Sequence, residues 1–426
     1  MGGKARDDRT VMEQAAVAGD HQDEAVPIND FIYLSQDVSN SYLVLTPHGD
    51  VAINAGTLHS GPRHRARYAA VSKGPLRYLV LTQSHTDHFG GAYDLVDSDT
   101  TIIAQADYPR VRDYWIKLAP FYGRRAGKLW AQVLGDRVSA RPREVVPHVL
   151  FEKEHRFELG GRRFELYATP GGETTDSSIV WMPDEKVVFT GNLFGPLFMC
   201  VPNFNTLRGD KMRSIGRFLE SLEIVRGLGA ELLITGHGEP IRGGAEIAAK
   251  LNRLRDGVRY IHDQTIAGMN AGKDVHTLMR EIRLPPELAL EESYGNVIWA
   301  VRTIWLEYTG WFHFDGTTDL YDVPVGSVAP DLLQLAGGSR KIAARAAQYV
   351  SEGQPLQALH LIELTLPAAP SDRALLEVKI DAQKALLARQ DGNFHSTMWL
   401  KADIAEVEKQ LAMKSQEMHD HQARKA

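Results

Sequence analysis

Short apolar runs alternate with polar turns over the first half of the chain, and this pattern predicts strands joined by helices. The runs have strand length, and turn signals such as Leu159-Gly160-Gly161-Arg162 separate them. We expect strands at residues 31–34, 42–45, 51–54, 78–81, 101–104, 148–151, 163–168, 178–182, 187–190 and 232–235. Apolar residues recur at helical spacing from Asp210 to Leu228, which predicts a helix that Asp210 can cap.

The strand signal ends near Pro240, and the remainder of the chain is predicted to be helical. We expect helices at residues 245–270, 296–305, 330–336, 339–353, 355–364, 372–390 and 393–411. The last of these are rich in alanine and leucine and resemble a short tetratricopeptide-like stack. Residues 1–27 are predicted to form a mobile or loosely packed lead-in, and residues 412–426 a polar, solvated tail.

The composition is that of a globular protein and limits the classes of partner. A chain of 426 residues is expected to form two domains, and 43% hydrophobic with 24% charged residues is ordinary for such domains. The net charge is −6, from 48 basic and 54 acidic residues, so neither nucleic acid nor an acidic membrane is an expected partner. No apolar run could span a membrane and the first residues do not resemble a secretory signal. The single cysteine, Cys200, excludes an intramolecular disulfide, and we expect a cytoplasmic protein.

Three candidate metal ligands follow one predicted strand within four residues. The apolar run from Leu76 to Thr82 reads as a buried strand, and His85, Asp87 and His88 come directly after it. Imidazole and carboxylate groups at this spacing suit a first-row divalent cation. Because α/β sheets hold their sites at the carboxyl ends of strands, the sequence predicts a metal site there.

The segment Gln83-Ser84-His85-Thr86-Asp87-His88 resembles the His-x-His-x-Asp-His motif of the metallo-β-lactamase superfamily, with Gln83 in place of the first histidine. Further blocks resemble the superfamily in order and spacing: Asn40–Thr46, Val51–Gly56 with Asn54-Ala55-Gly56 for the usual Asp-Thr-Gly, Thr169–Glu173, Phe189–Asn192 and Ile234–Gly238. The helical half resembles the dimerisation domain of the alkylsulfatases, at Tyr294–Val297, Tyr308–Phe312 and Leu335–Gly338.

The resemblance implies an α/β protein with two domains. An αββα metallo-β-lactamase sandwich is expected at residues 28–243, and an all-α helical dimerisation domain, which would make the protein a homodimer, at residues 244–411. Longer members of the family add a sterol-carrier-like domain, which this chain is too short to contain.

The resemblance also implies two zinc ions that share a hydroxide. The positions of the first metal's ligands are taken by Gln83, His85 and Glu173, and those of the second by Asp87, His88 and His237. Asn192 falls where the family places a bridging acid, and Arg208, in Thr206-Leu207-Arg208-Gly209, falls where an arginine holds the sulfate. Asp87 is expected to orient the attacking water as well as to bind metal. Asp87 and Asn192, which takes the position of the bridging acid, are therefore the candidate catalytic residues.

Two departures from the family fall on the first metal. Gln83 offers a neutral amide, which is a poorer zinc ligand than imidazole, and Asn192 removes a negative charge. Three outcomes are open: one tight metal at the second site, two metals of unequal affinity, or a harder metal such as iron or manganese at the first.

The sequence predicts a metal-dependent hydrolase that acts on a small, partly apolar molecule with an ester or sulfate-ester head. A carboxylic ester or lactone hydrolase, a divergent lyase or redox enzyme, and a non-catalytic binding protein are alternatives. The stretch Leu193–Pro202 is expected to line an apolar channel or to belong to the core. The aromatic side chains of the helical half are assigned to helix packing and the dimer interface: Tyr294, Trp299, Trp305, Trp311 and Phe312.

Overall fold

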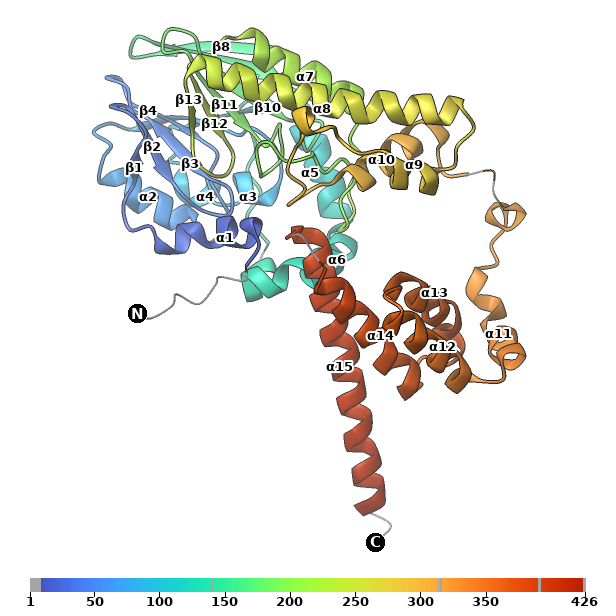
Figure 1. Cartoon of the computed structure of the whole chain (residues 1–426). Helices are drawn as coiled ribbons and strands as arrows, with labels where there is room; N and C mark the ends of the chain where they lie inside the picture. Colours follow the sequence, from blue (N-terminus) through green and yellow to red (C-terminus); the bar gives the residue numbers. More distant parts are fainter. Residues whose placement is uncertain (1–8, 140, 313, 315, 390–391, 424–426) are drawn as a thin grey trace, which may run out of the picture. The chain divides into compact units, whose positions relative to one another are not determined.

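The computed structural model describes residues 9–139, 141–312, 314, 316–389 and 392–423 (Figure 1). The chain divides into two compact units, Met1–Tyr308 and Thr309–Ala426, which are described separately. The first unit holds both sheets and also the helices between residues 244 and 308. The domain boundary predicted between residues 243 and 244 stays a prediction.

Two mixed sheets form the centre of the first unit. The first sheet has the order β1-β2-β3-β4-β5-β6-β7, with strands at Val26–Pro27, Ile32–Ser35, Ser41–Val44, Asp50–Ile53, Leu76–Val80, Thr101–Gln105 and Val149–Phe151. The second has the order β13-β12-β11-β10-β9-β8, in which β8 to β13 are Glu154–Leu159, Arg162–Ala168, Ser178–Met182, Val187–Gly191, Leu232–Thr235 and Ile241–Arg242. Strands β4 to β7 run parallel to one another, as do β11 and β12.

The two sheets pack face to face through one apolar layer. Ile53 and Val80 of the first sheet lie in the same buried cluster as Val180, Phe189 and Ile234 of the second. These strands are buried on both faces, which explains why they read as continuous apolar runs. Burial of this layer holds the strand ends of both sheets at a common edge.

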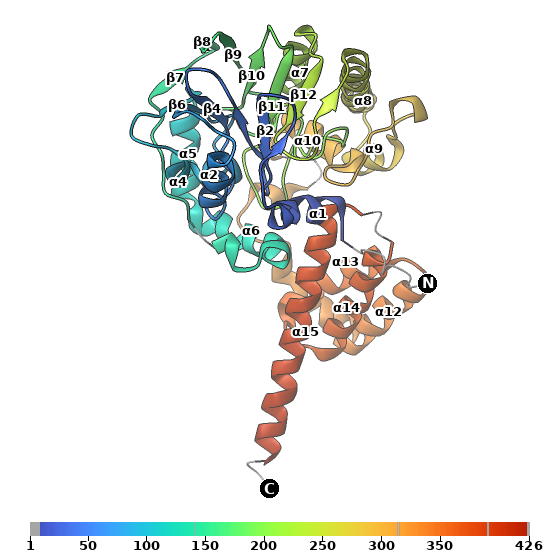
Figure 2. The ribbon, with the colours of Figure 1, turned by 90° about the vertical axis from the view of Figure 1, so that its left-hand side faces the viewer.

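Helices cover the outer face of each sheet (Figure 2). On the side of the first sheet lie α2 (Gly61–Ala69), α3 (Thr86–Phe89), α4 (Ala92–Leu95) and α5 (Tyr108–Lys117). On the side of the second lie α7 (Ile215–Gly227), α8 (Gly244–Asn270), α9 (Val275–Glu281) and α10 (Val297–Thr309). The fold is therefore the predicted αββα sandwich.

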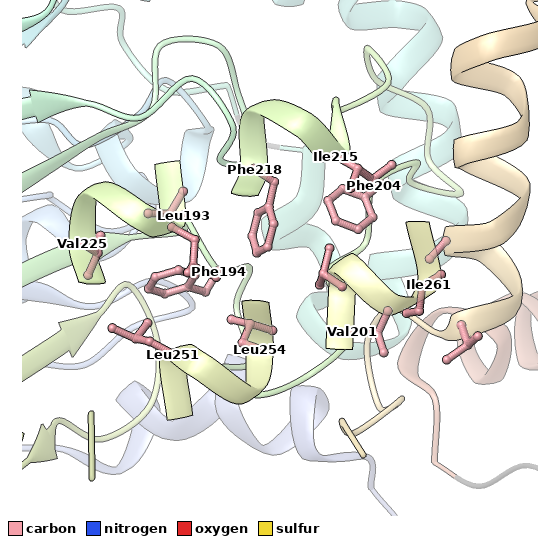
Figure 3. Packing of buried hydrophobic residues seen from close by; sticks show 14 of the residues in the cluster. Leu193, Phe194, Val201, Phe204, Ile215, Phe218, Val225, Leu251, Leu254 and Ile261 are labelled. Atoms are coloured by element: carbon pink, nitrogen blue, oxygen red, sulfur yellow. The ribbon is translucent and has the colours of Figure 1, made fainter. Parts of the chain in front are cut away.

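The largest apolar cluster lies between the second sheet and its helices (Figure 3). Phe218 of α7 contacts the rings of Phe194 and Phe204, with centroid distances of 6.4 and 5.4 Å. Leu251 and Leu254 of α8 complete this cluster. Leu193, Phe194 and Val201 belong to it as well, so most of the stretch that could have lined a channel is core.

The helix predicted from Asp210 begins five residues later, and Asp210 is not its cap. Ser214 has extended backbone and its side chain accepts a hydrogen bond from the amide of Arg217, so α7 starts at Ile215. Residues 203–213 form a loop instead, which returns to Phe204 through the amide of Arg213. The apolar Met212, which fitted the helical pattern, is exposed in that loop.

The lead-in is not loosely packed where the structure describes it, whereas the polar, solvated C-terminal tail stays a prediction. Residues 11–17 form α1, which Thr10 and Glu13 close with a reciprocal capping box and which buries Met12 and Ala16. At the other end α15 runs from Phe394 to Ala423, through most of the segment predicted as a tail. Residues 1–8 and 424–426 lie outside the described part.

Strands β1, β8 and β13 were not predicted. Two are only two residues long, and the side chains of β8 alternate between exposed and partly buried with few apolar residues. Helix α6 (Ala119–Leu134) was also missed. Short 3-10 helices lie at Ala18–His21, Gly135–Ser139, Pro286–Leu288, Thr317–Leu320, Val325–Val328 and Leu366–Ala368.

The second unit is a stack of helices. Helices α11 to α15 are Ala329–Ala336, Ser339–Ser351, Pro355–Thr365, Arg373–Leu387 and Phe394–Ala423. Small and branched side chains such as Ala346, Ile362 and Leu375 form its core. Within the described residues of the whole chain, no helix is both long and apolar enough to cross a bilayer.

The turn that carries Glu173 should depend on Gly171. A Cβ at this position would lie 2.1 Å from the carbonyl oxygen of Arg217 in α7, so Gly171→Ala must push the turn away from the helix. We expect a loss of about 1–3 kcal/mol in the free energy of unfolding, measured in urea. Gly127→Ala in α6 is the matched control, since no atom lies within 4 Å of its Cβ and helix propensity should raise stability by about 0.5–1 kcal/mol. Equal effects of the two substitutions would contradict this account.

Candidate metal centre

The predicted site residues leave the two sheets at one shared edge. His85, Asp87 and His88 follow β5 of the first sheet. Glu173 follows β9, Asn192 follows β11 and His237 follows β12, all in the second sheet. A cavity of about 180 Å³ opens at this edge, and five of these side chains line it: His85, Asp87, Glu173, Asn192 and His237.

Thr82 joins the two sheets directly beneath the site. Its amide donates to Oδ1 of Asn54 at 2.9 Å, and its carbonyl accepts from the amide of Ser178 in β10 at 2.8 Å. Gly191 packs closely against Thr82, so a Cβ at position 191 would lie 2.4 Å from Oγ1 of Thr82. The φ of Gly191, 51°, also favours glycine. The loops that carry the candidate ligands therefore begin at strand ends whose relative position is fixed.

The second set of predicted ligands forms a compact cluster. One ligand atom from each of Asp87, His88 and His237 lies within 4.8 Å of the others. Nε2 of His88 lies 3.7 Å and Nε2 of His237 lies 3.9 Å from Oδ2 of Asp87. Nε2 of His237 is buried and has no hydrogen-bond partner among the described residues. A buried, unpartnered imidazole beside a carboxylate fits a divalent cation.

Electrostatics favour the metal-binding forms of these three side chains. Burial lowers the pKa of His88 to about 4 and also lowers the pKa of His237, so both rings are neutral at pH 7. Burial alone would raise the pKa of Asp87, but the neighbouring imidazoles hold it below its ordinary value. Two neutral imidazoles and one carboxylate are a common ligand set of catalytic zinc.

Polar contacts behind His88 fix its ring. Its Nδ1 lies 2.9 Å from Oγ of Ser39 and 3.0 Å from Nδ2 of Asn54. Asn54 is the residue that replaces the family's aspartate, and its φ of 60° is one that asparagine tolerates well. Such contacts to the ring nitrogen opposite a metal orient the ligand.

The first set of predicted ligands is arranged differently, because protein groups contact several of its polar atoms. Oε1 of Gln83 and Oδ1 of Asn192 are buried without a hydrogen-bond partner among the described residues. Nε2 of Gln83 lies 3.0 Å from Nδ1 of His85, and Nε2 of His85 lies 3.4 Å from Oδ2 of Asp210. Nδ2 of Asn192 donates to Oε2 of Glu173 at 3.1 Å. The structure thus brings Gln83, His85, Glu173 and Asn192 together, but as partners of one another and of Asp210.

Arg213, which no motif of the sequence indicates, completes this network. Nη1 of Arg213 lies 3.0 Å from Oε1 of Glu173, and both side chains are more than nine-tenths buried. Burial alone would raise the pKa of Glu173, but Arg213 first and His85 second hold it well below the usual range. Burial would lower the pKa of His85, and hydrogen bonds to Asp210 and Glu173 raise it instead. Glu173 and Arg213 therefore form a buried ion pair.

Arg208 and an apolar wall line the rest of the cavity. The guanidinium of Arg208 lies 5.5 Å from the ring centroid of Trp115, within cation–π range. Its backbone is held by Arg125 of α6, which donates to the carbonyls of Leu207 and Arg208. The apolar lining comes from α1, α6 and nearby loops: Met12, Ala126, Trp130, Leu134, Pro142 and Pro196. Tyr294, which was assigned to helix packing, lines the cavity too.

Two family models match the chain in successive stretches. The model of the metallo-β-lactamase superfamily matches residues 34–237, and the model described as alkyl sulfatase dimerisation matches residues 274–409. Residues 34–237 are therefore similar to the metallo-β-lactamase superfamily, as the motifs predicted. The second match agrees with the resemblance to the alkylsulfatase-like branch that the motifs predicted.

Individual relatives agree with this assignment. The chain is 26% identical over 396 residues to a linear primary-alkylsulfatase of Pseudomonas sp., covering 87% of this chain and 74% of that protein. It is 24% identical to the alkyl/aryl-sulfatase BDS1 of Saccharomyces cerevisiae, covering 73% of this chain but only 52% of the relative. The solved stereoselective inverting sec-alkylsulfatase Pisa1 from Pseudomonas sp. has the same fold, with a TM-score of 0.80, 20% identity, and coverage of 92% of this chain and 70% of that one.

The loop that carries the histidines should depend on Arg112 of α5. Nη1 of Arg112 donates to the carbonyl of Ser84 at 3.1 Å, while Nε and Nη2 bind both oxygens of Glu144. Arg112→Met leaves the buried carbonyl without its partner, so we expect a loss of roughly 2–3 kcal/mol in the free energy of unfolding in urea. Arg110→Met, which breaks an exposed pair with Asp107 on the same helix, should change it by less than about 0.5 kcal/mol. If Arg110→Met lowered the free energy of unfolding as much as Arg112→Met or more, this role of Arg112 would be refuted.

Proposed function

We propose that the chain is a metal-dependent hydrolase that cleaves sulfate esters of apolar alcohols. The observation that carries the proposal is the cluster of Asp87, His88 and His237 at the edge of a cavity that also presents Arg208. Relatives that are named alkylsulfatases and share both family models support the same reaction class.

Asp87, His88 and His237 are the residues that would hold the cation, and zinc is the metal we propose from their chemistry. When bound, a divalent cation acts as a Lewis acid and makes a water nucleophile available near neutral pH. Asp87 is partly exposed toward the cavity while both imidazoles are buried, so its carboxylate can also accept a hydrogen bond from that water. Asn192, behind it, orients Glu173 rather than supplying charge.

Arg208 is the proposed anchor for the sulfate group. It presents a permanent positive charge inside the cavity, and its Nε is buried without a hydrogen-bond partner among the described residues. A guanidinium can hold two sulfate oxygens at once, which positions the ester for attack. The wall of α6 then offers an apolar surface to the alcohol part of the substrate.

Two further parts of the proposal concern the assembly and its setting. The match to the alkyl sulfatase dimerisation model supports a homodimer, which mass determination in solution would test. The only cysteine of the chain is buried and free, in keeping with a cytoplasmic setting, which cell fractionation would test.

His237→Ala should abolish both metal binding and turnover. Removing one of three ligands is expected to lower sulfate release from a linear alkyl sulfate by at least roughly 10²-fold. Inorganic sulfate is measured by ion chromatography and bound metal by mass spectrometry of the protein. His48→Ala, an exposed histidine in the turn between β3 and β4, is the control and should retain both. Turnover that survives His237→Ala would rule out the proposed centre.

Arg208→Met should separate sulfate esters from carboxylic esters. Loss of the guanidinium is expected to raise the KM for an alkyl sulfate roughly 10- to 100-fold, because a charged hydrogen bond contributes about 1.5–3 kcal/mol. The KM for a neutral carboxylic ester of the same alcohol should hardly change. Arg208→Lys keeps the positive charge but not the forked guanidinium. Its KM for the alkyl sulfate should therefore lie between those of the wild type and Arg208→Met. If only the carboxylic ester is affected, or is the better substrate throughout, the alternative acyl hydrolase takes the place of this proposal.

A further inference from the structure

The candidate centre has two halves, one with Asp87, His88 and His237 and the other with Gln83, His85, Glu173 and Asn192. They differ in which positive charge compensates the carboxylate. Asp87 faces the imidazoles of His88 and His237 and forms no ion pair with a guanidinium or ammonium group among the described residues. Glu173 already has one, since Nη1 of Arg213 lies 3.0 Å from its Oε1. The site expected for a first metal therefore carries its own permanent cation.

Several other polar atoms of that half also have protein partners, while Oε1 of Gln83 and Oδ1 of Asn192 have none among the described residues. Oε2 of Glu173 accepts a hydrogen bond from Asn192 and lies 3.5 Å from Nδ1 of His85. The two ring nitrogens of His85 face Gln83 on one side and Asp210 on the other. A metal here would have to displace these contacts and leave buried donors without acceptors, which is costly.

We propose that Arg213 replaces the first metal, so that the chain binds a single divalent cation, at Asp87, His88 and His237. The inference rests on the metal site of the proposed function and specifies its stoichiometry. Arg213 is a positioning residue, because it holds Glu173 and does not line the cavity.

The surrounding loop keeps the guanidinium in place. Nη1 of Arg213 also donates to the carbonyl of Asn203 at 2.6 Å, and its backbone amide donates to the carbonyl of Phe204. Breaking a buried ion pair on one side leaves the other charge unpaired in a poorly solvating environment. A dication placed beside this guanidinium would in addition be repelled by it.

Metal stoichiometry in the full chain tests the inference. Protein stripped with a chelator is titrated with Zn²⁺ by calorimetry, and bound metal is counted by mass spectrometry. We expect one equivalent in the wild type, with any second equivalent roughly 100-fold weaker or more. The pair Gln83→His and Asn192→Glu, which restores the family's ligands, should still bind one tight equivalent. Adding Arg213→Gln to that pair should allow a second equivalent of Zn²⁺ to bind tightly. Adding Arg213→Lys instead, which keeps the positive charge, should not.

Three results would overturn the inference without touching the proposed function: two tight equivalents in the wild type, a second tight equivalent in the Gln83→His and Asn192→Glu pair alone, or no second equivalent once Arg213→Gln is added. Circular dichroism and a first equivalent of unchanged affinity show that each variant is folded. Arg213→Gln alone gives a second reading, since it should strengthen the weak second binding event if the guanidinium is what opposes it. No bound metal in the wild type would overturn the proposed function together with this inference, whereas two would leave the proposed function standing.

Discussion

The backbone of Thr82 is the point on which the whole centre depends. It accepts a hydrogen bond from Ser178 in the second sheet and donates one to the side chain of Asn54 in the first. Apolar packing brings two sheets together but leaves them free to slide, because it has no direction. A directed bond at the strand ends fixes the register in which the loops with His85 and Glu173 meet. The glycine at 191 has no side chain because Thr82 occupies that space.

Charge then decides how the two halves of the centre are used. A buried carboxylate needs a compensating positive charge, and the fold can supply it as a metal or as an arginine. Asp87 lies between two imidazoles whose pKa values burial has lowered, so no proton supplies that charge near pH 7. Glu173 has Arg213 instead. The asymmetry that Gln83 and Asn192 indicated in the motif thus extends to residues outside it.

Much of the fold could be predicted because strands such as β4 and β10 are buried on both faces. The runs at residues 51–54, 78–81 and 178–182 correspond to β4, β5 and β10, within two residues at each end. Strand β8 was missed since it is half exposed and largely polar. The start of α7 was misplaced because Met212 continues the apolar spacing, whereas the hydrogen bond of Ser214 ends it. The N-cap at Ser214 therefore sets the start of α7, although the apolar periodicity alone favoured an earlier start.

The candidate ligands could be named from short motifs because each one follows a strand whose end the topology fixes. Arg213 and Asp210 could not, since they lie in an irregular loop and reach the site from the side, with no spacing that relates them to His85 or Glu173. A substitution within a motif shows which contact to a metal is lost. It does not show what has taken over the charge, because the compensating residue need only be close in space. For Glu173 that residue is an arginine forty positions further along the chain, brought there by the same loop that displaces the start of α7.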